Sequence, residues 1–177
     1  MQLWSGVLAA VPGSRLLLKT RPPLEDGVHQ LTAGRFAAHG ITADRIEMRG
    51  GCESIRDHLA SYADIDLGLD PFPYHGTTTT CEALWMGVPV VSLAGKSHPS
   101  RVGVSLLHAV GREDFIAQTP AQFIEIASRH ASDLSRLAAL RAGLRDRMRA
   151  SPLCDEVRFT RGFEAALQEI WRKWCAS

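Results

Sequence analysis

Four consecutive threonines, Thr77 to Thr80, and the glutamate at position 82 are the residues of this sequence whose types and spacing best suit chemistry. Gly76 precedes them, and a short run of helical character, CEALWM, follows and stops at Gly87. The first turn of a helix carries unpaired N–H groups and about half a unit of positive charge. Hydroxyl groups gathered at such a point favour a bound phosphate. We therefore predict a pyrophosphate or nucleotide site at residues 77–82.

A structural interpretation of the same residues stays open. Thr79 and Glu82 have the spacing of a capping box, in which the glutamate only accepts a hydrogen bond from the backbone N–H of the cap residue. One such cap needs a single threonine, whereas the sequence supplies four. The surplus of hydroxyl groups favours the phosphate hypothesis.

Candidate partners for that site lie elsewhere in the chain. His58 stands on an expected helix and His75 in the loop before the threonines, and each could equally be a surface or structural histidine. Lys96 follows an expected strand, where the ligand-facing loops of α/β sheets lie, and it either pairs with phosphate or is solvated. Asp66 and Asp70 alternate with apolar residues, but two aspartates without a third ligand are weak evidence for a metal site.

Composition limits the class of protein. The chain has 177 residues, of which 45% are hydrophobic and 22% charged, so one globular domain is expected. A net charge of +1 argues against nucleic acid or an anionic membrane as a partner. No apolar run approaches the roughly 20 residues of a membrane span. The four cysteines are scattered, which argues against a zinc site or a disulfide framework and makes a reducing cytoplasm the expected compartment.

Strands and helices alternate along the first two thirds of the chain. Their order predicts a doubly wound α/β fold with a parallel sheet, in which an α/β core at 1–118 is followed by C-terminal helices at 119–177. No GxGxxG follows a strand and no GxxxxGK[ST] occurs, so a standard dinucleotide site is disfavoured and a P-loop is excluded. The expected strands are 14–19, 45–48, 65–69, 88–93 and 115–117, and the expected helices are 1–10, 24–39, 53–62, 81–86, 100–110, 119–130, 133–149 and about 159 to the end.

Apolar spacing also predicts which side of two helices is buried. The helix at 24–39 is expected to face inward with Val28, Leu31 and Phe36. The helix at 53–62 is expected to carry Ile55, Leu59 and Tyr62 on one side.

The chain opens directly in a helix with no preceding strand, which suggests a piece of a longer protein.

With these motifs in place, the sequence resembles a known family. GTTTTCEALWMGVPVVSL, at 76–93, and SRVGVSLL, at 100–107, are similar to the C-terminal half of the O-GlcNAc transferase and Spindly-type glycosyltransferases. The likeness extends to LWSGVLAAVPGSRLLLK upstream and SPLCDEVRFTRGFEAALQEIW downstream, which covers nearly the whole chain. The resemblance implies the Rossmann-like C-terminal lobe of a GT-B fold. In that fold this lobe holds the sugar nucleotide, and the N-terminal lobe supplies much of the acceptor site.

The resemblance also implies a role for particular residues. Thr78 and Thr79 match the threonines that contact the diphosphate of the donor, and Glu82 matches the acidic residue that holds the ribose hydroxyls. His58, twelve residues before Asp70, matches a histidine that packs near the base and ribose. These roles agree with the chemistry of the residues, because N–H groups at a helix end stabilise a departing diphosphate and a carboxylate accepts hydroxyl protons.

The sequence departs from the O-GlcNAc branch at several positions. Thr77 stands where that branch has a histidine, and His75, two residues earlier, is a candidate substitute. Ile55 and Ser61 stand where it has positively charged residues, so the base of the donor, uridine or guanosine, stays open. A diphosphate-binding lysine of the family matches a position upstream of Met1. The expected nucleotide-sugar-binding residues are Thr77, Thr78, Thr79, Glu82, His58 and His75.

The function implied is that of the donor-binding lobe of a glycosyltransferase, which transfers a sugar from a UDP-sugar or GDP-sugar to Ser or Thr hydroxyls of proteins. A non-catalytic nucleotide-binding or protein-interaction module derived from such an enzyme is one alternative, and a sugar-nucleotide epimerase is another. No metal or other cofactor is expected, and no catalytic residue is assigned. The expected partners are the nucleoside diphosphate sugar, an acceptor protein or peptide, and an N-terminal lobe or helical-repeat region that the sequence lacks.

Overall fold

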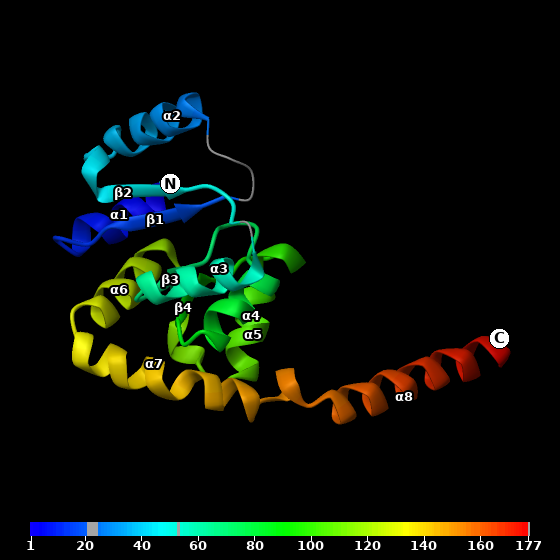
Figure 1. Ribbon diagram of the computed structural model, residues 1–177. Coiled ribbons are helices and arrows are strands. Elements are labelled where there is room, and N and C mark those ends of the chain that lie inside the picture. Colours follow the sequence, from blue (N-terminus) through cyan, green and yellow to red (C-terminus); the bar gives the residue numbers. More distant parts are fainter. Residues whose placement is uncertain (21–24, 53, 177) are drawn as a thin grey trace.

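The computed structural model describes residues 1–20, 25–52 and 54–176, and its strands are parallel (Figure 1). Strand β1 (Leu16–Lys19) pairs with β2 (Ile46–Arg49), and β4 (Val90–Leu93) lies between β3 (Gly68–Leu69) and β5 (Ile116–Ala117). Each parallel connection passes through a helix, as parallel pairing requires. The predicted parallel α/β fold is therefore confirmed, and its described strands form a two-stranded and a three-stranded sheet.

Helices cover these strands on more than one side (Figure 1). Helix α6 packs against α1, β4 and β5, and α7 packs against α4 and α6. Thr119 accepts a hydrogen bond from the N–H of Gln122 and Pro120 occupies the first turn, which confirms the predicted start of α6. The helices are α1 (Gln2–Ala10), α2 (Asp26–Ala37), α3 (Ile55–Ala60), α4 (Thr78–Trp85), α5 (Val102–Ala109), α6 (Pro120–Ala131), α7 (Leu134–Arg149) and α8 (Glu156–Cys175).

The main hydrophobic core lies around β4, whose residues are all buried. Leu84 of α4, Leu107 of α5 and Phe123 of α6 are fully buried against it, and burying a side chain of this kind contributes roughly 2 kcal/mol. Leu144 of α7 belongs to the same core, so α6 and α7 are part of one packed unit with the strands. This unit fixes the end of the sheet at which the predicted site residues lie.

In the segment predicted as a helix at 53–62, Leu59 and Tyr62 pack in one small cluster, whereas Ile55 is 75% exposed.

The predicted inward face of α2 is confirmed for Phe36 only. Val28 and Leu31 are 43% and 57% exposed. Helix α2 contributes Phe36, near its C-terminal end, to a small cluster with Leu8 and Ile41, and its earlier turns extend away from that cluster. Apolar spacing alone could not show that only the C-terminal end of α2 packs against this cluster. Leu24 and Glu53, predicted to begin helices, lie outside the described residues.

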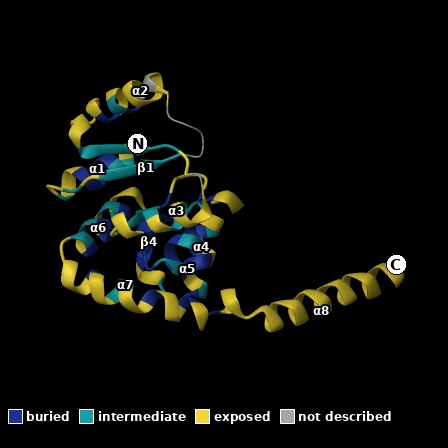
Figure 2. Cartoon of the chain, in the orientation of Figure 1, coloured by how far each residue is buried: buried dark blue, intermediate teal, exposed yellow. Residues whose placement is uncertain are grey.

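Helix α8 projects from the body of the molecule, and every described residue along it is exposed (Figure 2). It nevertheless carries an apolar stripe. The members of the stripe include Val157, Phe159, Phe163, Leu167, Ile170, Trp171 and Trp174, each more than half exposed.

Among the described residues, no helix is both long enough and apolar enough to cross a membrane.

Candidate nucleotide site

Helix α4 begins at Thr78, and Thr77, Thr78 and Thr79 are exposed at its start. The backbone bonding of the helix starts with Cys81, whose N–H donates to the Thr77 carbonyl at 3.0 Å. The N–H groups of the first turn therefore point out of the end of the helix, beside the threonine hydroxyls. Gly76 makes this arrangement possible, because a Cβ there would lie 2.6 Å from the hydroxyl oxygens of Thr79 and Thr80.

The capping-box interpretation of Thr79 and Glu82 is wrong. The helix has its N-cap at Thr77, where no side-chain cap bond forms. The Glu82 carboxylate instead turns toward α3 and the turn after it: its Oε2 lies 2.9 Å from His58 Nε2 and 3.4 Å from the hydroxyl of Tyr62. Glu82 is therefore positioned by tertiary contacts and lies beside the threonines without being used by the backbone cap.

His58 and Glu82 are brought together from two helices. His58 lies on α3, held there by Ser54, whose side chain accepts the N–H of Asp57 at 3.1 Å and caps the helix. The side chains of His58 and Glu82 are 30% and 22% exposed, so the pair is reachable from solvent. The His58 ring meets the ring of Tyr62 edge to face with centroids 5.7 Å apart, which restricts its rotation.

Tyr62 contacts both Glu82 and the first turn of α4 through its hydroxyl group. Its hydroxyl lies 3.2 Å from the carbonyl oxygen of Thr79, in the first turn of α4, as well as near Glu82. Burial, together with the negative charge of Glu82, raises the pKa of Tyr62. The phenol therefore stays protonated and acts as a donor, which ties the start of α4 to the α3 segment.

Lys19, the last residue of β1, completes this group and was not predicted. Its Nζ lies 2.9 Å from His58 Nδ1 and 2.9 Å from the hydroxyl of Ser61. The sequence held one signal for it, since ligand-facing residues of parallel sheets follow the carboxyl ends of strands and Lys19 ends the strand predicted at 14–19.

His75 lies beneath the threonine loop with its side chain fully buried. Its Nε2 donates to the carbonyl of Leu93 at 3.0 Å, and its Nδ1 accepts the N–H of Gly103 at 3.1 Å. Both ring nitrogens are thus occupied by backbone groups. A direct contact between this ring and a bound donor would require the ring to leave both partners, and in the structure it joins the loop to β4 and to α5.

Asp70 sits beside His75 in the same buried layer. One carboxylate oxygen accepts the N–H of Gly76 at 2.9 Å, and the other accepts the hydroxyl of Ser92 at 2.6 Å. Burial raises the pKa of the Asp70 carboxyl above its usual range, although Ser92, Gly76 and His75 oppose the shift. The aspartate fixes the backbone of Gly76 and with it the position of the threonines that follow.

Lys96 and Asp66, two further candidates from the sequence, are exposed. Lys96 lies in the loop that follows β4. Asp66 is exposed whereas Asp70 is buried, so the two do not face one site. Within residues 1–20, 25–52 and 54–176, no cluster of three or more His, Cys, Asp or Glu side chains is arranged to hold a metal ion.

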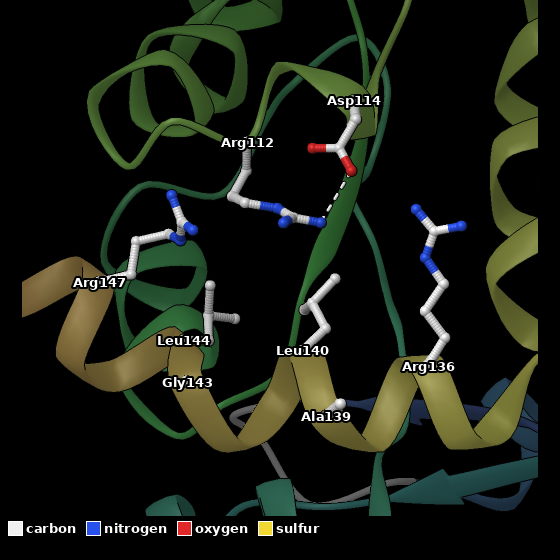
Figure 3. Close-up of a pocket in the computed structure, with 8 residues that line it drawn as sticks. All are labelled: Arg112, Asp114, Arg136, Ala139, Leu140, Gly143, Leu144 and Arg147. Carbon is white, nitrogen blue, oxygen red and sulfur yellow. Dashed lines mark hydrogen bonds and ion pairs between the residues drawn. The ribbon is translucent and has the colours of Figure 1, made fainter.

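A hollow of about 330 Å³ lies along α7, away from these residues (Figure 3). Arg112, Arg136 and Arg147 surround it, and Asp114 pairs with Arg112 at 2.8 Å. Its floor is formed by Ala139, Leu140, Gly143 and Leu144 of α7. None of the predicted nucleotide-binding residues lines it.

The polar group lies at the carboxyl end of β1 and at the start of α4, which is the edge where parallel α/β folds bind their ligands. The family model for glycosyl transferase family 41 matches residues 1–163. A solved structure of a mutant Thermobaculum terrenum O-GlcNAc transferase is similar with a TM-score of 0.91 and 36% identity, over 98% of this chain and 33% of that chain. This chain therefore belongs to glycosyl transferase family 41.

Curated relatives agree with the family. The chain is 41% identical over 175 residues to a probable UDP-N-acetylglucosamine–peptide N-acetylglucosaminyltransferase SPINDLY of Solanum lycopersicum, covering 99% of this chain and 19% of the relative. It is 28% identical over 175 residues to the UDP-N-acetylglucosamine–peptide N-acetylglucosaminyltransferase of Caenorhabditis elegans, covering 98% of this chain and 15% of the relative. The chain thus spans less than a fifth of the length of these relatives.

Proposed function

We propose that this chain is the donor-binding lobe of a glycosyltransferase that transfers a sugar from a nucleoside diphosphate sugar to Ser or Thr hydroxyls of proteins. One observation carries the proposal. The His58–Glu82 pair, with its 2.9 Å contact, lies beside the exposed threonines at the start of α4. The names of the relatives, which are peptide N-acetylglucosaminyltransferases, supply the reaction class.

The chemistry assigned to each group follows from its position. The N–H groups of the first turn of α4 and the hydroxyls of Thr78 and Thr79 stabilise the charge of the diphosphate as it leaves the sugar. Thr77 adds a third hydroxyl at the same edge. Glu82 accepts the ribose hydroxyls, and His58 lies where the base and ribose pack. In this proposal the positive helix end and the hydroxyls replace a metal ion, and the donor is a UDP-sugar or a GDP-sugar.

The proposed partner of this lobe is the preceding part of the family's catalytic region, which contributes the acceptor site. The matched structure extends well beyond the third of its length that this chain covers. The exposed apolar stripe of α8 offers a surface for that region, because a row of large apolar side chains in water is unfavourable. We propose the cytoplasm as the compartment, since all four cysteines are free thiols.

The test of the proposed function is calorimetric titration of the chain with UDP, GDP and ADP. We expect saturable binding of one diphosphate and weaker binding of the others, which would establish the donor site and identify the base. A folded sample that binds none of the three would contradict the proposal and favour a non-catalytic interaction module.

Helix α8 gives a separate prediction. Phe163→Asp together with Ile170→Asp is expected to leave the melting temperature unchanged within a few degrees, because no residue of α8 is buried in the core. We expect the isolated chain to self-associate through the exposed apolar stripe, and the same change should abolish this self-association, as measured by sedimentation equilibrium. Ala165→Asp with Arg172→Gln lowers the net charge by the same two units on the opposite side of the helix and should leave self-association intact. A large drop in melting temperature for the first variant would contradict this account.

A further inference from the structure

We propose that Lys19 is a positioning residue of the nucleotide site: it holds His58 as the neutral imidazole protonated on Nε2, and His58 in turn orients the Glu82 carboxylate toward the hydroxyl groups of the nucleotide. The identity of the ligand rests on the function proposed above. The hydrogen-bonded chain from Lys19 to Glu82 is a property of the fold and can be tested without any ligand.

The protonation state of His58 follows from its partners. The ammonium group of Lys19 has three N–H donors and no acceptor, so at 2.9 Å the His58 Nδ1 must accept. A neutral imidazole has one donor and one acceptor nitrogen, which places the ring proton on Nε2. That nitrogen lies 2.9 Å from Glu82 Oε2, where it donates to the carboxylate.

Lys19 is itself held in place. Its Nζ donates to the hydroxyl of Ser61 at 2.9 Å, and that hydroxyl donates to the carbonyl of His58 at 2.6 Å. The lysine therefore contacts both the ring and, through Ser61, the backbone of the histidine that it orients. This double contact connects the end of β1 to the end of α3.

The tautomer of His58 determines which oxygen of the Glu82 carboxylate remains available to a ligand. The protein donors that reach this carboxylate in the described ranges, His58 and the Tyr62 hydroxyl, both approach Oε2. Oε1 receives no protein hydrogen bond there, and the side chain is 22% exposed. Oε1 is thus the acceptor left for a ribose hydroxyl. With the opposite tautomer of His58, two acceptor atoms would face each other across 2.9 Å and the carboxylate would turn away.

The experiment combines nitrogen-15 NMR of the His58 ring with calorimetry on the same samples. In the wild-type chain we expect an unprotonated Nδ1 and a protonated Nε2. In Lys19→Met, which keeps an unbranched stem but loses the donors, we expect a mixture of tautomers. Lys19→Arg restores a donor that cannot accept, so it should restore the wild-type signature. Ser61→Ala, with Lys19 still present, should keep it as well.

Calorimetry then separates positioning from a merely structural role. Lys19→Met should weaken binding of the preferred nucleoside diphosphate about tenfold and leave inorganic pyrophosphate unaffected, since pyrophosphate engages only the threonine end of the site. Retention of the single Nε2–H tautomer in Lys19→Met overturns the proposal, and so does unchanged nucleotide affinity after the tautomer has changed. A wild-type chain that binds no nucleotide counts against the proposed function, and the tautomer comparison then decides the role of Lys19 toward His58.

Discussion

Replacing Thr78 and Thr79 together by valine is expected to weaken nucleoside diphosphate binding by about 100-fold or more. Each hydrogen bond to a charged group contributes about 1.5–3 kcal/mol, and about 1.4 kcal/mol corresponds to a factor of ten in affinity. Valine keeps the shape of threonine and removes only the hydroxyl. Both side chains are exposed, so the variant should fold normally. The measurement is calorimetric titration with the diphosphate that the wild-type chain prefers.

The matched control for this variant is Thr160→Val on α8. The Thr160 hydroxyl only donates to the carbonyl of Glu156 at 2.8 Å, far along the chain from the site. Its replacement should leave affinity unchanged. Inorganic pyrophosphate provides a second comparison, because it should lose affinity in the Thr78/Thr79 variant as the nucleotide does. If the double valine variant bound the nucleotide as tightly as the wild type, the diphosphate would not lie at the start of α4.

The fold could be predicted well where local signals agreed with one another. Helix α6 is the clearest case, since a threonine cap, a proline in the first turn and an apolar stripe indicated the same start. The end of α4 was likewise marked by Gly87, which adopts a left-handed φ of +79°. The exposed Val28 and Leu31 show the limit of this approach. Helical spacing reports which residues share a face but does not show whether another element covers it.

For the proposed site, the sequence predicted which residues take part but not how their side chains are arranged in space. Thr78, Thr79, Glu82 and His58 came from sequence and family resemblance, and the structure brings His58 and Glu82 within hydrogen-bond distance. Lys19 was missed because its partner His58 lies 39 residues away on another element, a separation that no local pattern encodes.

His75 shows the converse problem. Its place in a loop rich in proline and glycine suggested an accessible side chain, and the ring is buried with both nitrogens bonded. A polar ring can occupy such a position only when its hydrogen bonds are satisfied, and here backbone groups from β4 and α5 satisfy them. Sequence could not reveal this, because those partners come from segments that reach His75 only after folding.

The buried layer beneath the threonine loop gives the second large prediction. Asp70→Ala should destabilise the chain by about 3 kcal/mol, because it leaves the Ser92 hydroxyl and the Gly76 N–H without an acceptor in a buried setting. Asp70→Asn keeps an acceptor for Gly76 and can donate to Ser92, so it should cost less than about 1 kcal/mol. Urea unfolding at pH 7 measures both differences.

The pH dependence of this pair tests the cause. Because burial raises the pKa of Asp70 in the folded state above its unfolded value, the folded chain takes up a proton first as the pH falls. As the pH is lowered from 7 to about 4, the free energy of unfolding of the wild type should therefore increase relative to that of Asp70→Asn. The increase should disappear when the pH is raised again. The opposite slope would show that Asp70 is stabilised as a charged carboxylate by Ser92 and Gly76. Its main role would then be electrostatic. The predicted slope would instead show that burying Asp70 disfavours its charged form, and that the residue is kept because it holds the loop before the threonines.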